Sequence, residues 1–249
     1  MRGAKRMINI LLPIGGLSEM SEKMGYPYPA PLIELHGRPM IERVVDNLKE
    51  VASDCRFIFV LREDDCKKFH LDNIVKLLAP ESSIVIKLNG DTKGALCSAL
   101  MAVPHINNNT PLIVANSDQL FDAGVLGGFI HEMETLKADA GSPFFESVHP
   151  RWSYFRMNDS RVVEVAEKDP ISRNAVAGLY YFRSGELFVN AAKRAILNSR
   201  EISGSYYISA AMNELILDGL RVVGTSISND KFHSFFTPQR VEEYERLAV

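Results

Sequence analysis

The sequence predicts an α/β fold in which a parallel β-sheet is covered by helices on both faces. From residue 8 to residue 138, short apolar runs alternate with segments of helical periodicity. This alternation is typical of parallel sheets, because each connecting helix must cross one face of the sheet. The chain is also long and apolar enough for an extensive core, since it has 249 residues, of which 46% are hydrophobic and 24% charged.

Four predicted strands, each followed by a predicted helix, make up the first half of the chain. The strand segments are almost continuously apolar, as expected where both faces of a strand are buried. Three of the helices have a recognisable start: Pro39 lies in the first turn of the first, acidic residues open the second, and Asp91 or Thr92 caps the third. The strands are expected at 8–14, 56–61, 82–88 and 111–116, and the helices at 38–51, 63–79, 91–103 and 123–138.

The pattern changes after residue 138. A hairpin is predicted at 151–168, with its turn at the Asn-Asp-Ser segment 158–160. Further strands are expected at 174–183 and 221–228, and further helices at 184–198, 206–219 and 237–248. Because no linker or repeat separates the two halves, we expect a single domain, 1–249, in which the second half extends and covers the sheet of the first.

Charge and hydropathy exclude several classes of partner. The formal net charge of -3 gives no basic surface for nucleic acid or for an anionic membrane. No segment approaches the ~20 consecutive apolar residues of a membrane span. Basic residues precede the first apolar run, but this run is short, is interrupted by Pro13 and lacks a small-residue cleavage site, so it predicts a core strand rather than a signal peptide. We therefore expect a cytoplasmic protein.

Cysteine and histidine usage argues against a disulfide framework and against a histidine-based metal site. The three cysteines are widely spaced and include no Cys-x-x-Cys pair. The six histidines are scattered and include no His-x-x-x-His pair. We therefore expect reduced thiols and no zinc site.

The loops after the predicted strands contain the candidate functional residues, because ligands in such sheets bind beyond the carboxyl ends of the strands. Gly15 and Gly16 follow the first strand, and glycine there allows backbone N–H groups to approach an anion closely. A plain turn explains the two glycines equally well, since the residues that follow carry little positive charge. Gly94, after the third strand, suits close approach of a planar ligand or is a tolerated surface glycine.

Charged candidates follow the fourth strand and the predicted hairpin. Asp118 lies just past an apolar strand, where a carboxylate can hold a cation bound to phosphate. A helix N-cap is the alternative interpretation of Asp118. Glu167 and Lys168 end the hairpin, and the simplest interpretation of such neighbours is a solvated pair of opposite charges.

In their order and spacing, several segments together resemble the family of nucleotidyltransferases that join an NTP to a sugar 1-phosphate and release pyrophosphate. The likeness covers nearly the whole chain. Small capsule-type members are the most similar, since they share HPRWSY (149–154) and a segment like 206–219. The other matching segments are PIGGLS (13–18), PAPLIELHGRPMI (29–41), TKGAL (92–96), NSDQ (116–119), EKDPIS (167–172) and AGLYYFRSG (177–185).

This resemblance implies a Rossmann-like mixed sheet of the glycosyltransferase-A type, with helices on both faces. It implies a nucleotide-binding half at about 7–137 and a sugar-binding or lid half at about 138–249. It also implies Mg²⁺ as cofactor, an NTP and a sugar phosphate as substrates, a place in polysaccharide biosynthesis, and self-association into a homo-oligomer. The implied residues are Gly15, Gly16, Leu17, Gly94 and Asn116 for the nucleotide, Asp118 for the metal and catalysis, Glu167 and Gly178 for the sugar, and Lys168 for catalysis at the sugar phosphate.

The chain departs from the family pattern where charge is expected. Met20 stands in place of the loop Arg, Ala30 in place of a Lys, and Ser234 near the place of a C-terminal acid. Loss of two charge-assisted hydrogen bonds, at about 1.5–3 kcal/mol each, would slow transfer by roughly 10²–10⁴. Three functions therefore stay open: an active nucleotidyltransferase, a degenerate homologue that binds a ligand or regulates, and a glycosyltransferase of similar fold, whose usual D-x-D motif NSDQ does not match.

Overall fold

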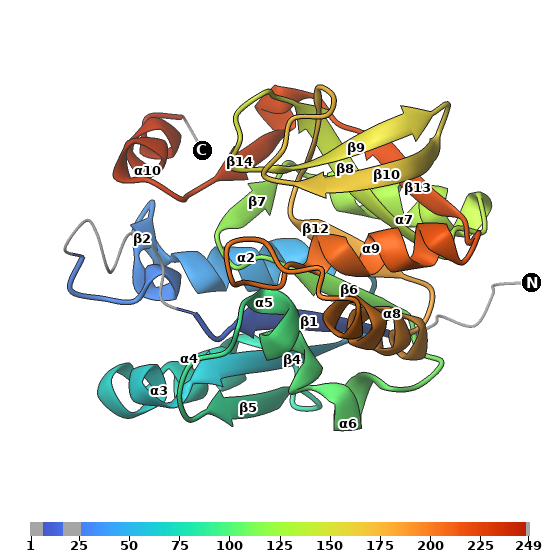
Figure 1. Ribbon diagram of the computed structural model, residues 1–249. Coiled ribbons are helices and arrows are strands. Elements are labelled where there is room, and N and C mark those ends of the chain that lie inside the picture. Colours follow the sequence, from blue (N-terminus) through green and yellow to red (C-terminus); the bar gives the residue numbers. More distant parts are fainter. Residues whose placement is uncertain (1–6, 17–25, 248–249) are drawn as a thin grey trace, which may run out of the picture.

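The computed structural model describes residues 7–16 and 26–247, and a ten-stranded mixed sheet runs through the chain with helices on both faces (Figure 1). The predicted α/β class with a mixed sheet is therefore confirmed. Across the sheet, the strands are β11 (Asn174–Val176), β9 (Ser153–Asn158), β10 (Arg161–Glu167), β13 (Val222–Ser226), β8 (Ala140–Glu146), β12 (Leu179–Phe182), β6 (Leu112–Ala115), β1 (Ile8–Ile14), β4 (Cys55–Arg62) and β5 (Ile84–Leu88).

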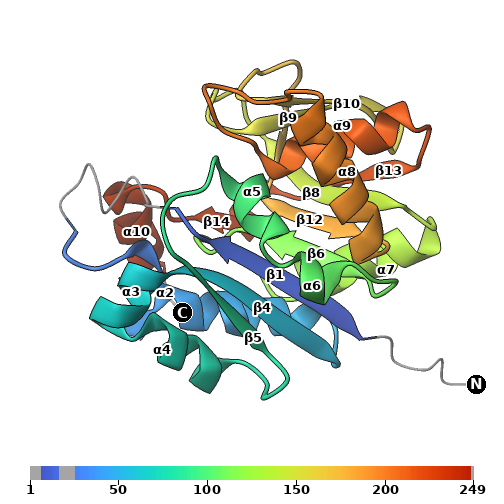
Figure 2. The same cartoon turned by 60° about the horizontal axis from the view of Figure 1, so that its bottom comes forward.

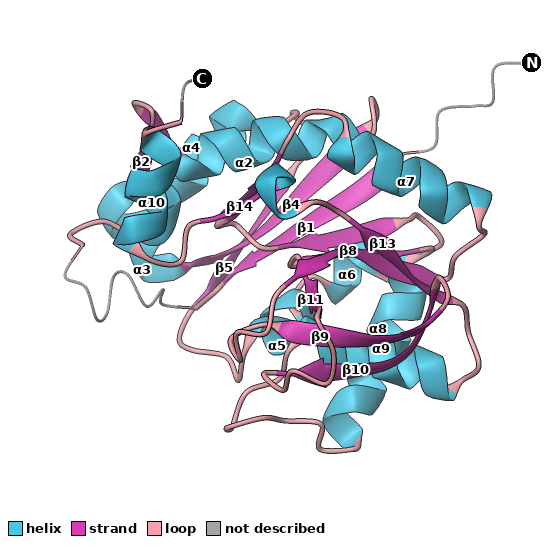
Figure 3. Cartoon of the chain, turned by 90° about the horizontal axis from the view of Figure 1, so that it is seen from above, coloured by secondary structure: helices cyan, strands magenta, loops and turns pink. Residues whose placement is uncertain are grey.

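Two groups of helices cover the two faces of the sheet (Figure 3). One face packs against α2 (Met40–Leu48), α3 (Glu63–Phe69), α4 (Leu71–Leu78), α7 (Val125–Thr135) and α10 (Pro238–Glu245). The opposite face packs against α5 (Ala95–Leu100), α6 (Val103–Ile106), α8 (Gly185–Leu197) and α9 (Ile208–Leu217). Within the described residues, no helix is long and apolar enough to cross a bilayer.

The central strand β1 explains why the first loop lies beside Asp118. Its side chains alternate between the two cores, with Ile10 and Leu12 in one and Leu11 in the other. β1 pairs in parallel with both β4 and β6, and Figure 2 shows these strands and β5 side by side. Because parallel strands end at the same edge, the residues after β1 and those after β6 meet there.

The second half of the chain continues the same sheet. β12 pairs antiparallel with β6 and with β8, while β13 pairs in parallel with β8. The hairpin of β9 and β10 forms as predicted, and Asp159 in its turn has a positive φ of 52°. The assignment of separate ligands to the two halves remains a prediction.

Short elements fix the chain around the sheet. A two-residue hairpin joins β2 (Glu34–Leu35) and β3 (Arg38–Pro39), and β7 (Gln119–Phe121) pairs with β14 (Phe232–Ser234). The 3-10 helices are η1 (Ala30–Leu32), η2 (Lys49–Val51) and η3 (Asn229–Lys231). The β7–β14 pair is important for the site, because it brings residues more than a hundred positions apart together.

Several predicted elements differ from the structure. The helix predicted at 63–79 is two helices, because His70 adopts a left-handed conformation with φ 55° between them. The third helix begins at Ala95 with Gly94 as its N-cap, so the expected caps Asp91 and Thr92 were wrong. The strand predicted at 174–183 is two strands, β11 and β12. Between them lies Gly178, which has a positive φ of 63°.

Strand β8 was missed altogether, although it lies within the sheet between β13 and β12. Gly141 and Pro143 interrupt its apolar run, and proline is normally confined to sheet edges. The structure shows why glycine is needed: a Cβ at Gly141 would lie 2.7 Å from the carbonyl oxygen of Val223 in β13. Close approach of two strands, rather than a break in the sheet, accounts for this glycine.

Candidate functional site

Two adjoining cavities lie at the sheet edge where β1 and β6 end. The first, of about 280 Å³, is lined by Gly16 and Gly94 and is called the Gly16 cavity. The second, of about 190 Å³, is lined by Glu167 and Lys168 and is called the Lys168 cavity. Both include Ala95, Asn116 and Asp118 in their walls. The structure therefore brings most of the predicted site residues together around Asp118.

The two glycines after β1 have different surroundings. A Cβ at Gly15 would lie 2.5 Å from Leu88 Cδ1 and 2.8 Å from Ser98 Oγ, so Gly15 is needed for packing and does not line either cavity. Gly16 lines the Gly16 cavity, and a Cβ there would contact no described atom. Leu17 and Met20 lie outside the described residues.

The backbone requires glycine at residue 94 whether or not a ligand binds. Its φ is 97°, and a Cβ there would lie 2.5 Å from the carbonyl oxygen of Tyr206. That oxygen accepts a hydrogen bond from Leu96 N at 3.1 Å, and Tyr206 N donates to Lys93 O at 2.8 Å. Gly94 thus allows the start of α5 to contact the Tyr206 backbone, and it also lines the Gly16 cavity.

The described wall of the Gly16 cavity is acidic. Asp65 and Asp118 are its charged side chains, and no Lys or Arg is among its described lining residues. Burial raises the pKa of both carboxyls, although Arg62 lies 3.7 Å from Asp65 Oδ1 and opposes the shift. Ala30, where the resemblance suggests a lysine, lies in this wall. The described part of this wall therefore offers an anion no positively charged side chain.

Asp118 lies in the turn between β6 and β7 and not at the start of a helix. Its carbonyl oxygen accepts a hydrogen bond from Phe235 N at 2.8 Å, because β14 pairs with β7. The N-cap of α7 is Gly124, so the interpretation of Asp118 as a helix cap was wrong. Ser234 of β14 lines the Lys168 cavity together with Asp118.

The donor set around Asp118 suits Mg²⁺ only together with a phosphate. Among the described residues, no group of three or more His, Cys, Asp or Glu side chains could hold a metal. Mg²⁺, however, is commonly bound by one or two carboxylates, with waters and substrate phosphate oxygens completing its octahedron. Asp118, with the Ser234 hydroxyl in the wall of the same cavity, fits that type of site.

Glu167 and Lys168 do not form a solvated pair with each other. Glu167 Oε2 accepts hydrogen bonds from Ser209 Oγ at 2.7 Å and from Ser153 Oγ. Burial raises the pKa of the Glu167 carboxyl, and the two hydroxyls only partly offset this. Lys168 is exposed, and its Nζ donates to Tyr207 OH at 2.7 Å. The two side chains therefore have separate partners, which orient both of them in the wall of one cavity.

Gly178 allows Asn116 to pack against the strand beside the Lys168 cavity. The glycine has φ 63°, and a Cβ there would lie 2.6 Å from Asn116 Nδ2. Asn116 N also donates to Gly178 O at 3.0 Å. A side chain at residue 178 would displace the amides of Gln119 and Asn116, and both of these residues line the Lys168 cavity.

A family model for the MobA-like NTP transferase domain matches residues 14–183. The chain belongs to the MobA-like NTP transferase family. The match includes every predicted site residue and ends before Ser234 and Tyr207, which complete the Lys168 cavity. The general role of the protein is therefore that of an NTP transferase.

Solved structures of similar fold are sugar-nucleotide enzymes by name. A nucleoside-diphosphate-sugar pyrophosphorylase from Vibrio cholerae RC9 has a TM-score of 0.82 at 22% identity, with 96% of this chain and 100% of that chain covered. A protein described as a glucose-1-phosphate thymidylyltransferase, from Bacillus anthracis, has a TM-score of 0.71 at 18% identity, with 98% of this chain and 97% of that chain covered. UDP-glucose pyrophosphorylase from Acinetobacter baumanii has a TM-score of 0.71 at 15% identity, with 96% of this chain and 92% of that chain covered. At these identities the likeness shows a shared fold. A comparison with curated protein sequences finds no match.

Sequence reasoning missed several residues of this candidate site. Tyr180 of β12 lines the Lys168 cavity, and its burial, together with the nearby charge of Glu167, raises the pKa of its hydroxyl. Arg151 and Trp152 also line this cavity. The only signal for these two was the HPRWSY likeness, which gave them no role.

Proposed function

We propose that this NTP transferase joins an NTP to a sugar 1-phosphate, or to a related phosphate, with release of pyrophosphate. One observation carries the proposal: Asp118 lies at the boundary of two adjoining cavities, one beside the glycine loop and one beside Glu167 and Lys168. Transfer between two substrates requires two such pockets around one reacting centre. The names of the structural neighbours agree with this chemistry.

The Gly16 cavity is the proposed nucleotide site. The backbone N–H of Gly16 would approach the phosphates, and Gly94 and Asn116 would border the base and sugar of the nucleotide. Asp118, with Ser234 nearby, would hold Mg²⁺ against the phosphate chain. When bound there, the ion neutralises phosphate charge, which the described wall of this cavity does not do by itself.

The Lys168 cavity is the proposed acceptor site. Two serine hydroxyls hold Glu167 Oε2, so the carboxylate is fixed to accept hydrogen bonds from sugar hydroxyls. Lys168 would contact the acceptor phosphate, and Gly178 would lie beneath the sugar. An oxygen of that phosphate then forms a bond to the α-phosphorus, while the bond from the α-phosphorus to the pyrophosphate oxygen breaks in line with it.

A second candidate function follows from the acidic wall of the Gly16 cavity. The described lining contains two carboxylates and no cation, which favours a homologue that binds a nucleotide-sugar or a phosphate without efficient turnover. Such a protein would act as a ligand-binding or regulatory module. It would show a thermal shift with ligand but release no pyrophosphate.

Pyrophosphate release, measured across several NTPs with Mg²⁺ and a panel of sugar phosphates, tests the proposed activity. We expect release with at least one pair and a loss of roughly 10²-fold or more in Asp118→Ala, since charge neutralisation at the reacting phosphates is lost. Asp122→Ala is the matched control, because Asp122 is exposed, lines neither cavity and has a hydrogen bond to His233 at 2.9 Å as its side-chain contact. No pyrophosphate release with any pair of substrates, or equal rates in wild type and Asp118→Ala, would contradict the proposal.

We further propose that the product serves polysaccharide biosynthesis in the cytoplasm and that the chain forms a homo-oligomer. These assignments follow from the resemblance to capsule-type members. Sedimentation of the purified protein tests the second of them, and a monomer at all concentrations would contradict it.

A further inference from the structure

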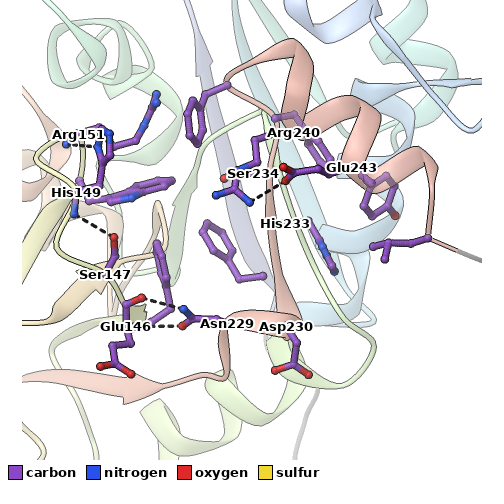
Figure 4. A pocket seen from close by; sticks show the side chains of 17 residues that line it. Glu146, Ser147, His149, Arg151, Asn229, Asp230, His233, Ser234, Arg240 and Glu243 are labelled. Atoms are coloured by element: carbon purple, nitrogen blue, oxygen red, sulfur yellow. Dashed lines mark hydrogen bonds and ion pairs between the residues drawn. The ribbon is translucent and has the colours of Figure 1, made fainter.

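Arg151 lies where the Lys168 cavity adjoins a third cavity. This third cavity has a volume of about 470 Å³ and is lined by six aromatic side chains, so it is called the aromatic cavity. Arg151, Trp152, Ser234 and Phe236 line both cavities. Figure 4 shows Arg151 on one rim of the aromatic cavity, with Ser234 and Arg240 on the other. A side chain at this junction can therefore contact ligands on either side.

Cation–π contacts with two aromatic rings hold the Arg151 guanidinium at this junction. Its central carbon lies 3.0 Å from the ring centroid of Phe236 and 5.5 Å from that of Trp152. The two rings are edge to face, with 85° between their planes. These contacts restrict where the guanidinium lies, and its planar pair of N–H donors matches two oxygens of a phosphate.

Arg151 is also close enough to act on Asp118 electrostatically. Both side chains line the wall of the Lys168 cavity. Lys168 contributes the second positive charge of the same cavity, and its Nζ lies 2.7 Å from Tyr207 OH. The Lys168 cavity thus has two cations in its wall, while the described wall of the Gly16 cavity has none.

We propose that Arg151 binds the phosphate of the acceptor beside Asp118, and that it supplies positive charge to the transfer site from the acceptor side. This assignment rests on the proposed function for the identity of the acceptor. It makes the edge-to-face pair of Phe236 and Trp152 a positioning device for the guanidinium. It also means that positive charge absent from the described wall of the Gly16 cavity is supplied from the other substrate's pocket.

Binding of glucose 1-phosphate and of inorganic phosphate to the purified full chain tests this proposal without any requirement for turnover. Trp152 is the single tryptophan of the chain, so its fluorescence reports on this junction without background. Calorimetry gives an independent affinity, which is needed because changes at Arg151 also alter the environment of Trp152. The variants are Arg151→Gln and Arg151→Lys.

Arg156→Gln is the matched control. Arg156 lies on β9, is exposed, and pairs with Glu164 at 2.7 Å outside both cavities. We expect Arg151→Gln to weaken phosphate binding by about 10- to 100-fold, the value of a charge-assisted hydrogen bond. The phosphate affinity of Arg151→Lys should lie between those of wild type and Arg151→Gln, since lysine keeps the charge and loses the planar donor pair. Arg156→Gln should bind as wild type does, and circular dichroism should show all variants folded.

Two results would overturn the assignment: binding by Arg151→Gln within twofold of wild type, or no binding of either phosphate compound to wild type at millimolar concentrations. The outcome is separable from that of the proposed function. If phosphate binding depends on Arg151 but the protein releases no pyrophosphate, the proposed activity is wrong and the phosphate site at Arg151 stands. If the protein turns over but phosphate binding does not depend on Arg151, the proposed activity stands and the role of Arg151 is wrong.

Discussion

The Gly16 cavity and the Lys168 cavity lie side by side but are built by different means. The wall of the Gly16 cavity is largely backbone and small side chains, and its described charges are two carboxylates. The Lys168 cavity is lined by longer side chains in a hydrogen-bonded arrangement, with two acids and two bases. On the proposed function, a phosphate in the first would depend on a metal ion, whereas a ligand in the second would meet donors that the protein already holds in place. The comparison teaches that the described charges which could bind a phosphate lie on the Lys168 side of Asp118.

Restoring charge on the nucleotide side should have the largest effect. We expect Met20→Arg with Ala30→Lys to raise NTP affinity or turnover by roughly 10²-fold or more, because each new charge-assisted hydrogen bond adds about 1.5–3 kcal/mol. Met20→Gln with Ala30→Gln controls for side-chain length without charge. Steady-state rates as a function of NTP concentration measure the change. No gain over the glutamine pair would mean that the difference in charge between the cavities does not limit the reaction.

A substitution at Gly94 tests whether backbone contact builds the Gly16 cavity. Gly94→Ala should lower the free energy of unfolding by about 1–3 kcal/mol through backbone strain at its positive φ. The clash of the new Cβ with the Tyr206 backbone should lower it further. Gly204→Ala is the control, since Gly204 also has a positive φ, of 78°, but a Cβ there meets no described atom within 4 Å. Urea unfolding measures both. Equal losses in the two variants would show that strain alone, and not the contact with Tyr206, makes Gly94 necessary.

The buried carboxylate of the Lys168 cavity predicts a smaller, pH-dependent effect. Burial raises the pKa of Glu167 in the folded state above its unfolded value, so the folded chain binds the proton more tightly. The stabilising effect of protonation is then fully present below the unfolded pKa and is lost as pH rises through the folded pKa. Wild type should therefore lose stability between mildly acidic and neutral pH relative to Glu167→Gln. Parallel pH profiles of the melting temperature in the two proteins would contradict this.

Much of the sheet was predictable because the decisive signals are local. The apolar runs of β1, β4 and β6 have the length and composition of buried strands, and the helices of the first half follow from their periodicity. β8 was not predictable, since its glycine and proline suit a sheet interior only once β13 lies against it. The division at Gly178 was equally non-local, because β11 and β12 pair with different strands.

The site was predictable as positions but not as interactions. Likeness to a family placed Asp118, Glu167 and Lys168 in one region, and the cavities bring them together. Nothing in the local sequence linked Ser209 to Glu167 or Tyr207 to Lys168, about forty residues apart. The cation–π contact of Arg151 with Phe236 spans an even longer separation in the sequence. Such contacts depend on the finished packing, which short segments do not encode.

The position of β13 has a consequence for synthesis of the chain. β13 pairs with β8 over five residues, Val222–Ser226, yet it is made some eighty residues later. A nascent chain on the ribosome therefore exposes the unpaired edge of β8 until translation has almost finished, and open strand edges recruit other chains. Pro143 in β8 limits such pairing. We expect chains halted before residue 222 to aggregate, or to need a chaperone, while the finished protein does not.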